Sequence, residues 1–275
     1  MNTIKTTLAL AALSLAAAAG SAQAARLQLV SGSSSGSVAT TVSSGAGDSV
    51  QLSGSTVDLS GTAELLGFGA GSDTGALAGG SVPLSQDWSQ LAVLDASGAT
   101  TTFQMDLSHS LSVSGPATVG ITQRSTLDLT GELRVASDGE ALGQDVAVRL
   151  QLDADGLLTS DFSGTSSTAG FTLEVRDSAN QLLASYTGPL AGASDSLDLS
   201  FASTVGQTLL FSMHWDGLTD VALTASPLAT ATLASSYLMG GTLAVTAVPE
   251  PQSALLLLAG LGLVAVRAAR REARH

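Results

Sequence analysis

The middle of the chain alternates apolar and polar residues with a period of two, and this pattern restricts it to β structure. In the segment 127–135, leucine or valine recurs at every second position except one, where glycine stands. Successive side chains of a β-strand point to opposite faces, so such a segment has one face for a core and one for water. The same alternation occurs in residues 146–152, 171–176, 197–201 and 243–245. The pattern predicts an all-β fold.

Turn-forming residues separate these segments. Asp177–Asn180 lies between the segment 171–176 and a second apolar run at 182–186, which predicts a hairpin. Further turns are predicted at Ser137–Gly139, Asp155–Gly156 and Asp216–Gly217. Short strands with glycine-rich turns favour an antiparallel β-sandwich or jelly-roll-like fold for residues 25–247, which we call the body.

Residues 31–80 are rich in Ser, Gly, Thr and Ala, and two interpretations fit them. A flexible arm would have this composition. However, Val50 and Leu52, like Val57 and Leu59, are spaced as in a strand. We therefore expect strands at a sheet edge.

The charge of the body limits its partners. Residues 25–247 contain five arginines, no lysine and 21 acidic residues, a net charge of −16. Such a surface repels phosphate backbones, so nucleic-acid binding is not expected. The chain has no cysteine, which excludes disulfides, thiolate metal sites and a cysteine nucleophile.

The N-terminus has the three parts of a secretory signal peptide in order. Lys5 precedes an apolar run from about Leu8 to Ala19, and Ala22-Gln23-Ala24 follows. An Ala-x-Ala sequence after a short apolar run is typical of signal cleavage. We predict a signal helix in residues 1–24, with cleavage after Ala24.

The C-terminus, residues 248–275, also has three parts. Pro249-Glu250-Pro251 cannot continue a strand or helix. Uncharged residues follow at 253–266, which predicts a short transmembrane helix with flanking residues at the interface. A basic tail at 267–275 contains Arg267, Arg270, Arg271 and Arg274. By the positive-inside rule this tail stays in the cytoplasm and the body lies outside.

These three parts together resemble the PEP-CTERM sorting segment. The resemblance covers only the C-terminal segment and implies that an exosortase in the inner membrane recognises Pro249, Glu250 and Pro251. It further implies export to the cell surface or the exopolysaccharide matrix. An ordinary tail anchor is the alternative, and it would also place the body outside the cytoplasm.

One group of acidic residues suggests a metal site. Asp153, Asp155 and nearby Asp161 could supply oxygen ligands for Ca²⁺ around a turn. Their spacing does not match an EF-hand loop, and Asp-Gly also forms ordinary turns. Calcium is therefore an open alternative to no cofactor.

The tryptophans suggest a sugar site. Trp88 and Trp215 each neighbour an acidic residue, so they could stack on carbohydrate or pack in a core. His109 and His214 lack a recognisable hydrolase motif around them, and the alternation places His214 on a polar strand face.

Three functions remain open for the body. The first is a non-enzymatic structural or adhesive protein of the cell surface or exopolysaccharide matrix, with no catalytic residues. The second is a carbohydrate-binding module of the extracellular matrix. The third is an extracellular glycoside hydrolase, which would need two carboxylates facing each other across a cleft.

Overall fold

The computed structural model describes residues 25–77, 81–189, 195–225, 230–248 and 260. The predicted signal helix with Ala22 and Ala24 lies outside the described residues, as do Pro249–Pro251 and the basic tail. The predicted transmembrane helix is also outside them, apart from Gly260. In the part of the chain that is described, no helix has the length and apolar character needed to span a membrane. Gln23–Val245 forms one compact unit.

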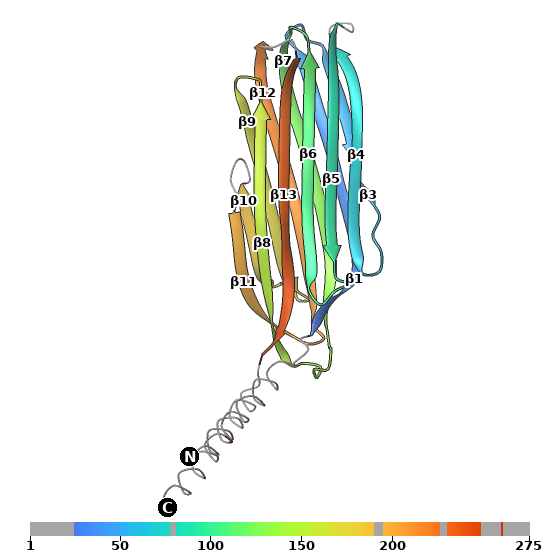
Figure 1. Ribbon diagram of the computed structural model, residues 1–275, viewed down its shortest axis with the longest axis vertical. Helices are drawn as coiled ribbons and strands as arrows, with labels where there is room; N and C mark the ends of the chain where they lie inside the picture. The colour runs from blue at the N-terminus through green and yellow to red at the C-terminus, as the bar shows by residue number, and fades with distance from the viewer. Residues whose placement is uncertain (1–24, 78–80, 190–194, 226–229, 249–259, 261–275) are drawn as a thin grey trace, which may run out of the picture. The chain divides into compact units, whose positions relative to one another are not determined.

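The described residues of the body form thirteen β-strands (Figure 1). Their bounds are β1 (Arg26–Ser44), β2 (Ser49–Ser55), β3 (Val57–Asp58), β4 (Glu64–Leu77), β5 (Val82–Asp95), β6 (Thr101–Ser114), β7 (Thr118–Ala136), β8 (Asp145–Ser160), β9 (Thr165–Asp177), β10 (Leu182–Pro189), β11 (Asp195–Thr204), β12 (Thr208–Ala225) and β13 (Thr230–Ala247).

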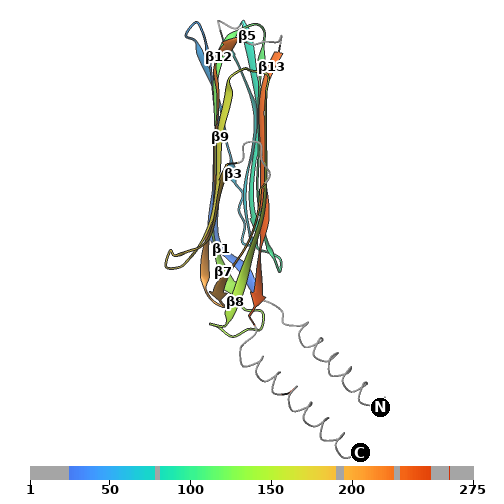
Figure 2. The ribbon, with the colours of Figure 1, turned by 90° about the vertical axis from the view of Figure 1, so that its left-hand side faces the viewer.

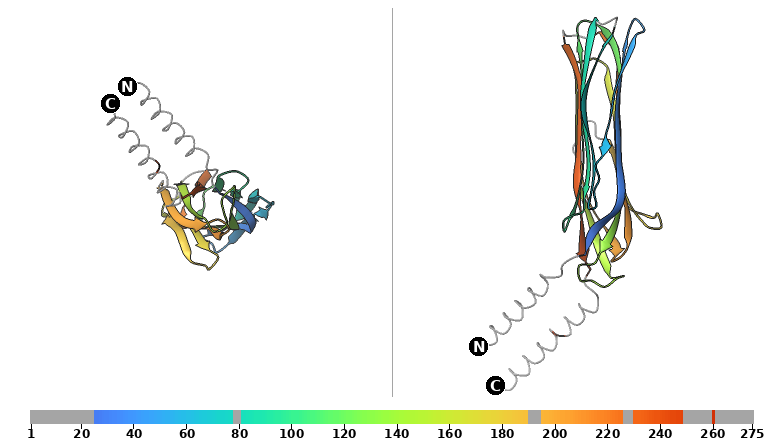
Figure 3. Two further views of the ribbon diagram at one scale, coloured as in Figure 1. Left: turned by 90° about the horizontal axis from the view of Figure 1, so that it is seen from below. Right: turned by 90° about the vertical axis from the view of Figure 1, so that its right-hand side faces the viewer.

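The strands form two sheets. Sheet A has the order β10-β9-β12-β7-β1-β2, and sheet B has the order β11-β8-β13-β6-β5-β4-β3. Neighbouring strands pair in antiparallel fashion, for example β1 with β7 and β5 with β6. Figure 2 and the right-hand view of Figure 3 show the two layers side by side along the strands. The predicted all-β fold is confirmed, and the two antiparallel sheets are consistent with a β-sandwich.

The alternation in the sequence corresponds to the two faces of each sheet. In β12, Phe211, Met213 and Trp215 are each only 1% exposed, whereas His214 between them faces solvent. Burial of such side chains is the main force that holds the layers together, at about 25 cal/mol per Å² of apolar surface.

Two predicted turns are confirmed and two are wrong. Ser137–Gly139 lies between β7 and β8 as expected, and Gly139 has a positive φ of 122°. Asp177–Asn180 joins β9 to β10 as expected, and Asn180 has a positive φ of 64°, which asparagine tolerates. Asp155–Gly156 lies inside β8, and Asp216–Gly217 lies inside β12. At Gly217 a Cβ atom would lie 2.9 Å from Nε1 of Trp215, so this glycine makes room for the indole within the strand.

A β-bulge in β1 changes which residues face the core. The register with β7 shifts between Leu29 and Ser31, and Val30 is 54% exposed. Odd-numbered residues such as Leu27 are buried before the bulge, and even-numbered residues such as Val38 are buried after it. One inserted residue inverts the alternation of everything that follows it.

The glycines of the Ser- and Gly-rich stretch make room for a large core side chain. Most of residues 31–77 lie in strands β1 to β4, as predicted, and β2 and β3 are edge strands. Trp88 of β5 packs over Gly54 and Gly69. A Cβ atom would lie 2.1 Å from Cζ2 of Trp88 at Gly54, and 2.8 Å from Cζ3 at Gly69. A larger residue at either position would displace the indole.

The core contains two apolar clusters at different positions along the strands. The larger cluster includes Leu107 and Phe211, and the smaller one includes Leu111 and Ile121. Along β6, His109 lies between the two clusters and is 5% exposed. The interior is therefore interrupted by polar side chains.

Candidate functional site

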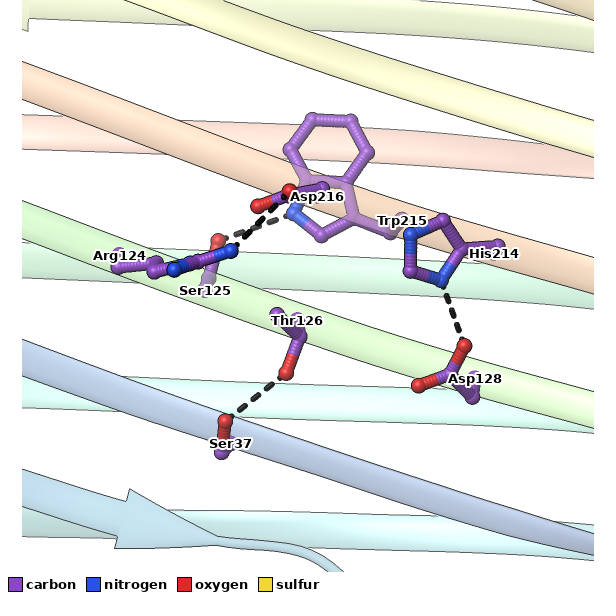
Figure 4. Close-up of polar contacts among 8 residues, drawn as sticks. All are labelled: Ser37, Arg124, Ser125, Thr126, Asp128, His214, Trp215 and Asp216. Atoms are coloured by element: carbon purple, nitrogen blue, oxygen red, sulfur yellow. Dashed lines mark hydrogen bonds and ion pairs between the residues drawn. The ribbon is translucent and has the colours of Figure 1, made fainter.

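Both tryptophans proposed for sugar stacking lie in the core. Trp215 is 1% exposed and Trp88 is 9% exposed. The Trp215 ring lies 4.3 Å from the ring of Tyr237, centroid to centroid, and its Nε1 donates to Ser125 Oγ at 2.9 Å (Figure 4). A sugar in solvent cannot stack on a ring covered in this way, so this sequence prediction is corrected.

The other aromatic residues also provide few exposed rings on which a sugar could stack. The chain has ten Phe, Tyr and Trp residues. Eight of them are buried, namely Trp88, Phe103, Phe162, Phe171, Tyr186, Phe211, Trp215 and Tyr237. Phe68 on the outer face of β4 is 46% exposed. The described surface therefore presents few rings to a flat ligand.

The three acidic residues proposed for calcium are not brought together. Asp153 and Asp155 are exposed on the outer face of β8. Asp161 follows that strand, and its Oδ2 accepts hydrogen bonds from N and Oγ1 of Thr232 at 2.9 and 2.8 Å. These bonds lower the pKa of Asp161 and fix its carboxylate against β13. The predicted triple is therefore corrected to a pair on β8 and a separate hydrogen-bonded residue.

A third acidic residue lies beside the pair on β8, but its side chain points to the other face of the sheet. Asp195 of β11 lines a surface depression of about 630 Å³ with Asp153, Asp155, Gln104 and other residues. Asp195 was missed in the sequence because it reaches β8 through strand pairing across many residues, with Asp195 opposite Ala154. Its side chain already has a partner, since Oδ2 accepts a hydrogen bond from the Tyr186 hydroxyl at 2.7 Å. Burial and this carboxylate raise the pKa of Tyr186 to about 12.

Across the described residues no group of three or more His, Asp or Glu side chains is arranged to hold a metal ion. Calcium prefers about six to eight oxygen ligands. We therefore expect millimolar calcium to leave the melting temperature of the protein unchanged, measured by differential scanning calorimetry against a chelator-treated sample. A calcium-dependent rise that disappears in the Asp153→Asn, Asp155→Asn double variant would contradict this.

The outer face of sheet A carries paired polar side chains. Asp128 Oδ1 lies 2.6 Å from His214 Nδ1, and Arg124 pairs with Asp216 at 3.4 Å (Figure 4). The side chains of Asp128 and His214 are 47% and 52% exposed. Exposed pairs of this kind contribute about 0–1 kcal/mol each, so they belong to a solvated strand face. His214 is on the polar face that the sequence predicts.

Comparisons with known proteins bear mainly on the C-terminus. Residues 247–272 match the family model described as the PEP-CTERM protein-sorting motif. No curated protein matches the chain.

The likenesses to solved structures are weak. One is to a structure described as "CBM4 structure and function", with 12% identity, 44% of this chain and 71% of that chain covered, and a TM-score of 0.15. Another is to the VP2 subviral particle of infectious bursal disease virus, with 11% identity, 83% and 67% covered, and a TM-score of 0.16. A third is to the T13 IBDV viral particle, with 11% identity, a TM-score of 0.17, and 83% of this chain but only 65% of that chain covered. Scores this low carry no argument about the body.

The resemblance noted in the sequence is thus found independently and at the same place. A motif of this kind implies processing by an exosortase membrane enzyme and export through the membrane to the cell surface. The chain carries the PEP-CTERM protein-sorting motif at residues 247–272.

Proposed function

We propose that this protein is a non-enzymatic structural or adhesive component of the cell surface or exopolysaccharide matrix, delivered by exosortase-type sorting. The observation that carries the proposal is the sorting motif at residues 247–272. In the proposed route the signal peptide directs export, and the apolar segment holds the protein transiently in the inner membrane. Recognition of Pro249–Pro251 then releases or transfers the body.

The surface of the body supports a role without catalysis. His214 is paired with Asp128, Asp216 with Arg124, and Asp161 with Thr232, so each of these polar groups already has a partner within the protein. The second histidine, His109, is buried. A hydrolase needs carboxylates that face each other across a cleft. Asp153 and Asp155 lie on the outer face of sheet B, whereas the Asp195 carboxylate points toward sheet A and accepts a hydrogen bond from Tyr186.

The charge of the body favours its solubility outside the cell after sorting. Its net charge of −16 keeps copies apart in solution and disfavours binding to nucleic acid. Exopolysaccharide is the proposed surrounding material. A dedicated sugar site gains no support from the tryptophans, since both are covered by core residues.

Changing Pro249, Glu250 and Pro251 to alanine is expected to leave the full-length protein in the inner membrane. Without these residues the exosortase loses its recognition sequence, while the apolar segment that holds the protein is intact. Cell fractionation with detection of the body would measure the distribution between membrane, cell surface and medium.

A matched control changes Pro83, Pro116 and Glu64 to alanine, which removes the same residue types from the body. This control is expected to reach the surface normally. If the variant at Pro249–Pro251 reached the surface or medium as efficiently as the wild type, exosortase-type sorting through these residues would be excluded.

A further inference from the structure

Polar side chains of both sheets meet in the middle of the core. In sheet A, Thr40 of β1 lies opposite Gln123 of β7. In sheet B, His109 of β6 lies opposite Ser235 of β13. All four side chains are in the interior, with exposed fractions of 0, 3, 5 and 9% for Thr40, Gln123, His109 and Ser235. We call these four residues the polar layer.

The polar layer separates the two apolar clusters. His109 alternates with Leu107 of the larger cluster and Leu111 of the smaller one. Gln123 follows Ile121 of the smaller cluster and precedes Leu127 of the larger one. Both residues occupy the apolar phase of their strands, so a polar residue at an apolar position of the alternation is the sequence signal for this layer.

Hydrogen bonds join the two sheets within the polar layer, but two of its polar atoms have no hydrogen-bond partner. Thr40 Oγ1 lies 3.1 Å from His109 Nε2, and Ser235 Oγ donates to Gln123 Oε1 at 3.5 Å. His109 Nδ1 and Gln123 Nε2 are buried and have no partner. A buried polar atom without a partner costs about 1–3 kcal/mol, so native proteins rarely leave one unpaired.

The chemistry of the two atoms defines what can bind between them. If His109 donates from Nε2–H to Thr40, its Nδ1 is an acceptor, whereas Gln123 Nε2 is a donor. Among the described residues, none of the buried polar side chains is an Asp, Glu, Lys or Arg, so a bound ion would lack a countercharge. The ligand must be neutral and small, and it must both donate and accept. Water meets all of these conditions.

We propose that the polar layer binds an ordered water molecule that accepts from Gln123 Nε2 and donates to His109 Nδ1. The water completes a link between β6 of sheet B and β7 of sheet A. Gln86, one inward position along β5 from Trp88, is likewise fully buried with both amide atoms unpartnered. The hydrated layer fixes the alignment of the two sheets, because sliding one sheet by a residue pair would break every bond in it.

A crystal structure of the purified protein at high resolution tests the proposal directly. The expected result is an electron-density peak for water about 3 Å from both His109 Nδ1 and Gln123 Nε2. The proposal is overturned if that position is empty, or if both atoms are paired with protein groups instead.

A solution measurement tests the same site without a crystal. Oxygen-17 magnetic relaxation dispersion counts water molecules that stay bound longer than the protein takes to tumble. Gln123→Met is expected to lose at least one such water, whereas the control Gln51→Met, the same change on the exposed face of β2, is expected to lose none. An equal count in all three proteins would contradict the proposal, and if Gln123→Met does not fold, the wild-type density decides.

Discussion

Replacing Trp215 with alanine is expected to lower the free energy of unfolding by about 3–5 kcal/mol, the range for truncating a buried tryptophan. The indole is 1% exposed, its ring contacts Tyr237, and its Nε1 donates to Ser125. The variant leaves a cavity between the sheets and an unpaired hydroxyl at Ser125. Urea unfolding followed by circular dichroism would measure the loss.

The control is Phe68→Ala, which removes an aromatic ring that is 46% exposed on the outer face of β4. Its cost is expected to stay below about 1 kcal/mol, as for most surface substitutions. If Trp215→Ala cost no more than Phe68→Ala, the indole would have to be accessible, and the sugar-stacking interpretation would regain its basis.

Acidification is expected to destabilise the protein through His109. Burial lowers the pKa of His109 from 6.5 to about 4. Thr40, Gln123, Trp88 and Ser235 pack around it, and none of them is charged, so nothing in the layer compensates a proton on the ring. At about 1.36 kcal/mol per pKa unit, the shift corresponds to about 3 kcal/mol.

The pH range of this destabilisation follows from the pKa values of His109 in the unfolded chain and in the folded protein. Above about pH 6.5 His109 is neutral in both states and its full contribution is present. Between pH 6.5 and 4 the unfolded chain binds a proton that the folded protein excludes. The free energy of unfolding therefore decreases as the pH is lowered through this range. Below about pH 4 both states are protonated and this loss is complete.

The measurement is urea unfolding at a series of pH values for wild type, His109→Gln and the exposed-residue control His214→Gln. Carboxylates contribute their own pH dependence to all three proteins, so the difference between wild type and His109→Gln isolates the buried histidine. The free energy of unfolding of wild type minus that of His109→Gln should fall by about 3 kcal/mol as the pH falls to 4. Parallel curves for wild type and His109→Gln would rule out a buried neutral histidine.

Much of the strand pattern could be predicted from the sequence, because alternation records which face is buried. It correctly separated Phe211, Met213 and Trp215 from His214, and it located the hairpin at Asp177–Asn180. Local rules sufficed for these features, since each depends on residues close together in the chain.

The errors arose where the cause is distant in sequence. Gly217 resembles a turn residue, but it is small because Trp215 needs space beside Ser125 of another strand. Trp88 resembles a surface ring beside an acid, yet glycines of β2 and β4 create the space that buries it. The position of Asp195 beside β8 likewise depends on strand pairing, which the alternation cannot specify.

The long antiparallel strands also determine how the body responds to mechanical tension. β13 pairs with β6 at fourteen successive positions, from Thr230 opposite Ser114 to Leu243 opposite Thr101. A pull on the C-terminal end of β13, opposed at the turn that joins β6 to β7, acts along the strands. The hydrogen bonds of an antiparallel pair run across the strands, so this pull shears them together instead of unzipping them one by one. Tension applied in that direction is therefore resisted by the whole length of the pairing at once.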